Sequence, residues 1–474
     1  MQKFSEVSTE FPPYEDIEGP RTKSEWIPLN KRNKLSFLHI VAICCSMLGF
    51  QIAYSVEFAL GTPIMTDLGV PSKYTSVIWL VGPLSGFFVQ PLIGYASDGC
   101  HAKLGRRRPY IIGGGIGIIA GLLVIFFVKD IGKMLSSSNP SGASIAIFII
   151  ALLEFNICIN VLQGPSRALL GDVIPPGQQV FANAIASLML GLAAILTNLI
   201  GGLNLVQYTA LKDYQLIFVV GMVLIAFSVI LTSFAAKEEQ FTETLNRKNP
   251  FAELWYAVRN LPPEVARISI VYFFSWMAYF PFNVEVTDFV GRDCYHSTPG
   301  NVEYNNGVNF GMLITAASNA LNLIYSPAQD SFINCVGMKT AYGISQVLEA
   351  VCLFPLFFQG VTDKQWVVFA LSIPLGVANT VFNSVPYAVL GLSVPKDKIG
   401  TFMGALNSCC VLGQQLSNFI CISGIGSINA LNGRKGPCIA SGSIFAIIAT
   451  IACPFIIVPN GGQASVNEPL VQGE

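Results

Sequence analysis

The sequence predicts an all-α polytopic membrane protein with twelve transmembrane helices in two six-helix halves. Of its 474 residues, 52% are hydrophobic and only 12% are charged, and the mean hydropathy is +0.57. Such a composition is typical of a membrane protein rather than a soluble domain. Crossing a hydrocarbon core of about 30 Å takes roughly 20 apolar residues, and the chain contains twelve such runs. A polar segment at 236–266 separates the sixth run from the seventh.

The spans follow one another with short polar connections. We expect them at residues 37–60, 75–96, 110–129, 143–166, 180–206, 214–235, 267–287, 306–327, 339–358, 366–392, 400–424 and 439–459. The chain then divides into an N-tail (1–36), an N-terminal six-helix bundle (37–235), a central loop (236–266), a C-terminal six-helix bundle (267–459) and a C-tail (460–474). The polar N-tail contains no cleavable signal peptide, so the first span is expected to direct insertion.

Charge distribution predicts the orientation. With both termini inside, most of the 27 Lys and Arg residues fall on the cytoplasmic side, as the positive-inside rule requires. We therefore expect both tails and the central loop to be cytoplasmic. The plasma membrane is the expected location, with a vacuolar or other internal membrane as the alternative. A net charge of −1 gives no indication of nucleic-acid binding.

A short pattern occurs once in each half. After the second span Asp98 stands seven residues before Gly105, and after the eighth span Asp330 stands seven residues before Gly337. Internal duplication is the simplest cause, and parallel halves of this kind are found in secondary transporters.

Three consecutive arginines follow the first copy of this pattern. Asp98 can form charge-assisted bonds with Arg106, Arg107 and Arg108, and such bonds can break and reform as one bundle moves against the other. We therefore predict a gate at this position. The alternative is that the arginines only anchor the loop on the cytoplasmic side.

The fourth span carries a polar stripe. Asn156, Asn160, Gln163 and Arg167 are spaced by four, three and four residues, which places them on one helical face. Polar groups at bilayer depth are costly and usually face the protein interior or a water-filled path. Glu154 lies about 200° around the helix from Asn156 and so faces away from this stripe.

Other spans contribute polar and aromatic side chains that suit a neutral sugar. Amides and hydroxyls both donate and accept hydrogen bonds, as sugar hydroxyls do, and aromatic faces cover the apolar C–H surface of a sugar. Taken singly, each amide has an alternative role as a hydrogen bond between helices. The predicted substrate-binding residues are Gln51, Tyr54, Trp79, Asn156, Asn160, Gln163, Trp276, Asn283, Asn319, Asn379, Asn383 and Gln414.

Several motifs resemble known transporters. The run from Gly94 through Asp98 to Gly105 and the arginines resembles the loop 2–3 signature of the major facilitator superfamily, in the glycoside-pentoside-hexuronide symporter branch. Segments 78–83, 89–94, 163–170, 274–276 and 287–293 are similar to plant-type sucrose/proton symporters, and 56–63 to the animal solute carrier family 45. The resemblance implies the major facilitator fold and a sugar and protons as transported partners.

The resemblance also implies a proton-handling Asp eleven residues before Arg167, where this chain has Asn156. Three alternatives follow. The proton site is lost and the protein is a facilitator, or Glu57 on the polar face of the first span has replaced it, or Glu154 has. We favour Glu57. Arg167 is expected to face Glu57 or the sugar, with a snorkelling position beside Asp172 as the alternative.

The seventh span ends in further charged residues. The resemblance assigns a role in transport to Asp288, Arg292 and Asp293, as an extracellular gate, and a solvated loop is the alternative reading. Cys294 and Cys438 are both expected outside, where they either pair or remain free thiols.

Two hypotheses from different classes remain. The first is a proton-coupled carrier for a neutral sugar, with an uncoupled facilitator as its nearest rival. The second is a protein of the same fold that no longer moves substrate and acts as a sensor, although its short tails leave little room for signalling. The sequence contains no metal cluster, nucleotide loop or nucleophile constellation, so we expect no enzymatic activity and no cofactor.

Overall fold

The computed structural model describes residues 27–458, except 176–177, 204, 210, 212–213, 241–248, 395–398 and 432. The predicted C-tail and most of the predicted N-tail therefore lie outside the described residues. Within the described part the chain is helical and contains no strand. Twelve of its helical segments are long and apolar enough to cross a membrane, which confirms the predicted fold class of an all-α, multi-pass membrane protein.

The spans are built from single helices or from two helices in series. Their bounds are α1 (Phe37–Asp67), α2 (Ser72–Trp79) with α3 (Val81–Asp98), α4 (Arg108–Phe126), α6 (Pro140–Val173), α7 (Gln179–Gly202), α8 (Gln215–Ala235), α10 (Pro263–Phe289), α11 (Val302–Tyr325), α13 (Met338–Leu353), α15 (Gln365–Ser372) with α16 (Leu375–Ser393), α17 (Ile399–Ser417), and α18 (Gly436–Ala440) with α19 (Gly442–Ala452). Four shorter helices lie between spans, namely α5 (Val128–Leu135), α9 (Pro250–Arg259), α12 (Gln329–Val336) and α14 (Gln359–Thr362).

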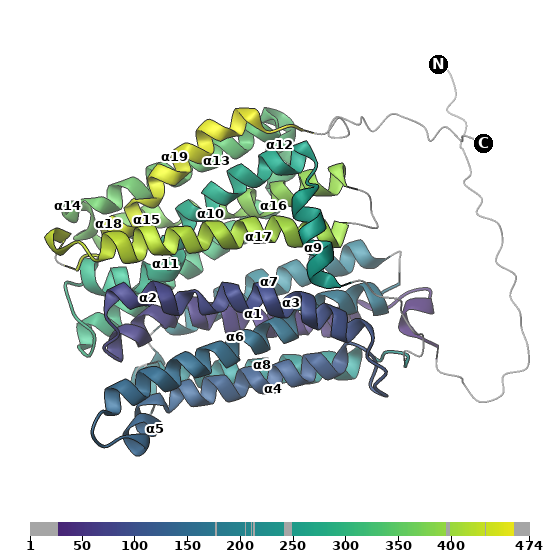
Figure 1. Ribbon diagram of the computed structural model, residues 1–474, viewed down its shortest axis with the longest axis horizontal. Coiled ribbons are helices and arrows are strands. Elements are labelled where there is room, and N and C mark those ends of the chain that lie inside the picture. Colours follow the sequence, from purple (N-terminus) through teal and green to yellow (C-terminus); the bar gives the residue numbers. More distant parts are fainter. Residues whose placement is uncertain are drawn as a thin grey trace, which may run out of the picture.

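The helices form two groups that lie side by side (Figure 1). The purple and blue helices α1–α8 make up one group, and the green and yellow helices α10–α19 make up the other. One apolar core draws mainly on buried residues from 29 to 236, and a second draws on residues from 257 to 456. Helix α9 crosses between the groups and contacts α3 and α17, with the rings of Phe88 and Phe251 6.3 Å apart.

Helix α6 is longer than predicted. The apolar run predicts a span over 143–166, whereas the helix continues to Val173 and contains Pro165 in its interior. Proline removes one backbone hydrogen bond and usually kinks or ends a helix, yet the residues after it remain helical. Arg167 therefore lies within the helix instead of at its end.

We name the two ends of the molecule by their residues. The arginine end carries Arg106, Arg107 and Arg108, and the other is called the opposite end. The segment before α1 lies at the arginine end, where Lys31 Nζ is 3.6 Å from Glu239 Oε2. Because the number of spans is even, the segment after α19 returns to the same end.

Candidate functional site

A cavity of about 360 Å³ lies between the two groups of helices. Residues of α1, α2, α3 and α6 line it on one side, and residues of α10, α16 and α17 line it on the other. Eleven of the predicted residues meet here: Gln51, Tyr54, Glu57, Trp79, Asn156, Asn160, Gln163, Arg167, Trp276, Asn383 and Gln414. The polar stripe of the fourth span therefore faces the same space as polar side chains from both halves.

Three predicted binding residues do not line the cavity. Asn283 lies two helical turns after Trp276 in α10, beyond the cavity. The next residue, Val284, already contacts α1. Asn379 accepts a hydrogen bond from the Asn383 amide within α16. Asn319 is on α11, which packs mainly against α7. Helical periodicity gives the direction of these side chains but not their depth, so their part in substrate binding stays a prediction.

Amide groups of α3 and α6 bind one another along the cavity wall. Gln90 Nε2 donates to Asn160 Oδ1 and to Gln163 Oε1, both at 2.8 Å. The Tyr54 hydroxyl donates to the same Gln163 oxygen at 3.4 Å. Sequence reasoning missed Gln90 as a cavity residue, although it lies in segment 89–94. These contacts hold the amides in place, and each can be exchanged for a contact with a hydroxyl-bearing solute.

Two glycines bring α3 close to the stripe. A Cβ atom at Gly82 would lie 3.0 Å from Asn156 Oδ1, and one at Gly86 would lie 3.4 Å from Asn160 Oδ1. Because these glycines are one helical turn apart, α3 approaches α6 at both positions, as small residues allow in membrane helices. Larger side chains would press on the two amides.

Glu57 lies directly opposite Asn156. Its side chain is buried, with 6% of the residue exposed, and its Oε1 accepts a hydrogen bond of 2.7 Å from Asn156 Nδ2. The same amide nitrogen also donates to the Leu152 carbonyl at 3.0 Å, which fixes its orientation. The carboxylate of the first span therefore contacts the position at which the resemblance implies an acid.

Arg167 and Glu154 take different positions. The Arg167 side chain is exposed and lines the cavity. Asp172, the partner in the snorkelling alternative, is instead bound by Arg106 and Arg107. Glu154 faces α4, where a Cβ atom at Gly121 would lie 2.5 Å from its Oε2, and it accepts a bond from Cys158 Sγ. It does not line the cavity, in agreement with its predicted direction.

Aromatic rings form a stack on one wall of the cavity. The ring centroids of Tyr54 and Phe58 are 6.1 Å apart with planes 16° from parallel, and those of Phe58 and Trp79 are 5.7 Å apart at 9°. Trp276 lies on the wall formed by the second half, 5.3 Å from Phe382. Aromatic faces from both halves are thus available to cover an apolar surface.

The arginine cluster, which comprises Arg106–Arg108 and its carboxylate partners, belongs to the first half. Arg107 binds Asp98 at 2.5 Å and Asp172 at 2.8 Å, and Arg106 makes a bidentate pair with Asp172. Burial disfavours the Arg107 charge, but Asp172 and Asp98 outweigh it and raise the pKa of the guanidinium. The ion pairs of the three arginines with Asp98, Asp172 and Glu238 lie within the first half. The pairing of Asp98 with this arginine run is thus present, and its role as a gate stays a prediction.

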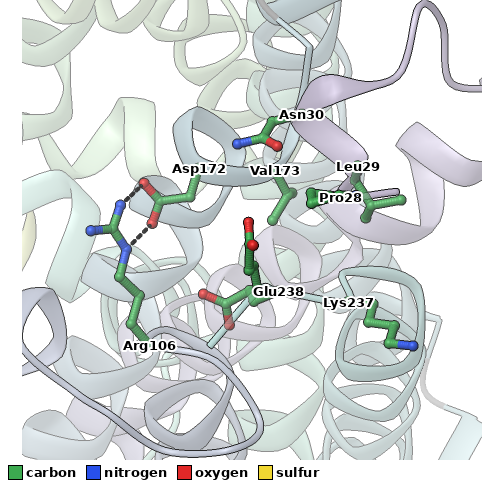
Figure 2. Close-up of a pocket in the computed structure, with 9 residues that line it drawn as sticks. Pro28, Leu29, Asn30, Arg106, Asp172, Val173, Lys237 and Glu238 are labelled. Carbon is green, nitrogen blue, oxygen red and sulfur yellow. Dashed lines mark hydrogen bonds and ion pairs between the residues drawn. The ribbon is translucent and has the colours of Figure 1, made fainter. Parts of the chain in front are cut away.

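Glu238 completes this cluster from the segment after α8. Its carboxylate accepts bonds from the backbone N–H groups of Arg107 and Arg108, at 2.9 to 3.1 Å. Burial raises the pKa of this carboxyl, while those two N–H groups act in the opposite direction. Gly105 has φ of +102°, and a Cβ there would lie 2.3 Å from Glu238. Figure 2 shows Glu238 and the Arg106–Asp172 pair beside a small pocket of about 180 Å³ that Pro28 and Leu29 also line.

A second ionic cluster, the opposite-end cluster, is formed by Asp288, Arg292, Asp293 and their partners. Arg292 Nε donates to both oxygens of Asp288 at 2.9 Å, and Lys435 Nζ lies 3.0 Å from Glu285 and 3.6 Å from Asp288. Burial opposes the Lys435 charge, but these two carboxylates outweigh it and raise the pKa of the ammonium. Asp288 is fully buried, so the solvated-loop reading was wrong.

The remaining contacts of the opposite-end cluster also stay within the second half. Asp293 accepts bonds from the backbone N–H groups of Lys435 and Gly436, at 2.9 and 2.8 Å, and so holds the start of α18. Sequence reasoning missed Lys435, which is distant in sequence from the seventh span. Cys294 and Cys438 are both buried free thiols, so the disulfide alternative is not supported.

Comparisons with known proteins agree with this architecture. The family model described as the Major Facilitator Superfamily matches residues 39–418. The chain is 28% identical to "Sucrose transport protein SUC4" of Arabidopsis thaliana, with 90% of this chain and 91% of the relative covered. It is 27% identical to "Sucrose transport protein SUT3" of Oryza sativa subsp. indica, with 92% and 95% covered. The resemblance to plant sucrose transporters predicted from the motifs is thereby confirmed.

Solved structures show the same fold. A D-xylose-proton symporter superposes with a TM-score of 0.65 at 13% identity, over 90% of this chain and 99% of that chain. A nucleoside transporter, NupG, gives the same TM-score and identity over 89% of this chain and all of that chain. The predicted major facilitator fold is therefore confirmed.

Proposed function

We propose that this chain, which belongs to the Major Facilitator Superfamily, is a secondary transporter that moves a neutral sugar across a membrane by alternating access. Sucrose or another disaccharide or glucoside is the proposed substrate class. The observation that carries the proposal is the cavity between the halves, whose walls combine amides and aromatic rings from both. Movement of one half against the other would change access to such a cavity.

The character of the cavity favours a neutral solute. Glu57 and Arg167 are its single carboxylate and single cation among the described residues, so the lining has no excess of either sign. An anionic substrate would favour additional cations. Relatives that cover nearly the whole chain are named sucrose transport proteins, which supports a disaccharide.

Glu57 is the proposed proton carrier. It is buried, it lines the cavity, and its partner Asn156 is neutral in either state of the carboxyl. When Glu57 is ionised it accepts the bond from the Asn156 amide, and when it is protonated its own O–H becomes available to a substrate oxygen. Glu154 lies against α4 and is not among the residues that line the cavity.

The topology supports a cytoplasmic position for the arginine end, because basic residues gather on that side of membrane proteins. Both termini would then be cytoplasmic. The plasma membrane is the proposed location.

Uptake into proteoliposomes tests the proposal. Labelled sucrose, maltose and glucose are supplied with and without an imposed pH gradient. We expect wild-type protein to concentrate a disaccharide when protons flow inward, and Glu57→Gln to exchange labelled for unlabelled sugar without concentrating it. Glu154→Gln is the matched control, and it should concentrate sugar as wild type does.

The other outcomes select among the alternatives. Wild-type uptake that equilibrates but never concentrates would reject symport and favour the facilitator, which the Asn at position 156 makes the second candidate. A protein that takes up none of these sugars would contradict the sugar assignment. Concentrative uptake by Glu57→Gln with unchanged pH dependence would move the proton site elsewhere.

A further inference from the structure

Two threonines join the halves at the opposite end. Thr62 Oγ1 of α1 donates to the Val284 carbonyl of α10 at 2.8 Å, and Thr287 Oγ1 of α10 donates to the Ala59 carbonyl of α1 at 2.7 Å. Each threonine thus binds the carbonyl three positions before the other threonine. The two bonds are related as the two sides of an isologous contact are, which is the arrangement expected where two duplicated halves meet. Both threonines are buried, with 1% and 0% of each residue exposed.

The sequence explains why one of these carbonyls needs a partner. The carbonyl of Ala59 would normally accept a bond from the N–H four residues later, but that residue is Pro63, which lies inside α1 and has no N–H. Neighbouring Ser and Thr hydroxyls commonly satisfy such carbonyls in membrane helices. The same device occurs in α10, where Pro281 frees the Met277 carbonyl and Ser417 Oγ donates to it at 2.6 Å.

A third contact leads from this threonine pair into the cavity. Trp79 Nε1 donates to Thr62 Oγ1 at 3.1 Å. The indole ring of the same residue stacks on Phe58 in the cavity wall. A Cβ at Gly61 would lie 2.9 Å from the Trp79 ring, so the indole is held closely against α1. One side chain therefore contacts both the cavity and the pair of bonds between the halves.

From this geometry we propose that Thr62 and Thr287 form a lock that keeps the opposite end closed, and that Trp79 is the positioning residue through which an occupied cavity acts on the lock. The coupling through Trp79 rests on the proposed sugar transport, whereas the lock itself does not. A solute pressed against the aromatic stack would move the indole, and loss of its bond to Thr62 would weaken the contact with Val284. When the end opens, water reaches the freed carbonyls.

Hydrogen–deuterium exchange measured by mass spectrometry on the full chain in nanodiscs tests the lock. We expect Thr62→Val and Thr287→Val to raise exchange at least twofold in segments 59–67 and 284–294, and to lower it at the arginine end, over 98–108. Each lost bond should shift the population by about fivefold. Thr287→Val should have the larger effect, because it leaves the Ala59 carbonyl without any donor in the closed state.

Thr66→Val is the matched control. Thr66 is on the same helix, and its hydroxyl donates to the Thr62 carbonyl within α1, so it contributes nothing between the halves. If the two lock variants exchange as Thr66→Val does, the lock is rejected. Faster exchange at both ends of the molecule would also reject it, because that result describes general loosening.

Trp79→Phe tests the coupling, since phenylalanine keeps an aromatic ring but lacks the indole N–H. In wild type, saturating sucrose should change exchange over 59–67, and in Trp79→Phe this response should fall at least twofold while bound labelled sucrose remains measurable. An unchanged response rejects the role of Trp79. If wild type shows no sucrose response while the threonine variants still shift exchange, the lock stands and the proposed substrate fails.

Discussion

The two ionic clusters differ in how deeply their carboxylates are buried, although each contains three acidic and three basic side chains. In the arginine cluster, Asp98 is 46% exposed and lies at the surface of the first half. In the opposite-end cluster, Glu285 and Asp288 are fully buried in the second half. Both clusters tie spans together within one half, whereas the bonds between the halves at the opposite end are neutral hydroxyl-to-carbonyl bonds.

This difference has a physical rationale. Separating a buried ion pair leaves an uncompensated charge and costs about 3–5 kcal/mol, whereas a neutral hydrogen bond contributes about 1 kcal/mol. In the transport cycle proposed above, contacts that break in every turnover are better made of the second kind. Ion pairs thus connect spans within each half, and weaker neutral bonds join the halves that the proposed cycle would move against each other.

The largest expected effect concerns Lys435. Lys435→Met removes the cation that serves both Glu285 and Asp288, so we expect it to destabilise the protein by about 3 kcal/mol, read as a lower Tm in detergent. Arg434→Met is the control. Arg434 is 26% exposed and 3.7 Å from Asp293, which keeps two backbone donors, so the loss should stay below about 1 kcal/mol. Equal losses of stability in the two variants would mean that burial does not determine how much each basic residue contributes.

A smaller effect is expected in the arginine cluster. Arg107→Gln leaves Asp98 and Asp172 without their shared partner and should cost about 2 kcal/mol. Asp98→Asn, at the exposed side of the same pair, should cost less than about 1 kcal/mol. Thermal unfolding of both variants measures the difference. If Asp98→Asn lowered the stability more than Arg107→Gln, the exposure of Asp98 would not explain the energetics of this pair.

The smallest effect is a pH dependence from Glu238. Burial raises the pKa of this carboxyl in the folded protein above its ordinary value of 4.5. The folded chain then keeps a proton that the unfolded chain has released, so stability falls as pH rises from about 4.5 through the raised pKa, and is constant below both. We expect Glu238→Gln to lose this slope when Tm is followed between about pH 4 and 7. If the dependence of Tm on pH were unchanged in Glu238→Gln, other titrating groups would be its cause.

Much of the fold could be predicted because apolar length and periodicity are local properties. The twelve spans follow from the length of the apolar runs. The face of α6 that carries Asn156, and the opposite direction of Glu154, follow from residue spacing along that helix. The depth of Asn283 does not, because it depends on where α1 meets α10. Lys435 was missed for the same reason, since only the packed second half brings it to Glu285.

The arginine cluster illustrates a different limit. The charges at Asp98 and Arg107 are evident in the sequence, and their pairing was predicted correctly. Their predicted role as a gate depends on movement of one bundle against the other, and residue spacing in the sequence does not reveal such movement. The carboxylates of Asp172 and Glu238 come from distant segments and bind the arginines within the first half. No local sequence pattern predicts these contacts.

The cavity wall also has an electrical consequence. Glu57 is the one carboxylate among the described residues that line it, and Asn156 cannot titrate. A carrier built this way, moving a neutral sugar with one proton, would transfer one positive charge in each cycle. The membrane potential would then add roughly 2.3 kcal/mol per 100 mV to the driving force, which corresponds to about a fiftyfold concentration ratio. Sugar uptake would therefore generate an inward current that is proportional to the rate of transport and can be measured electrically.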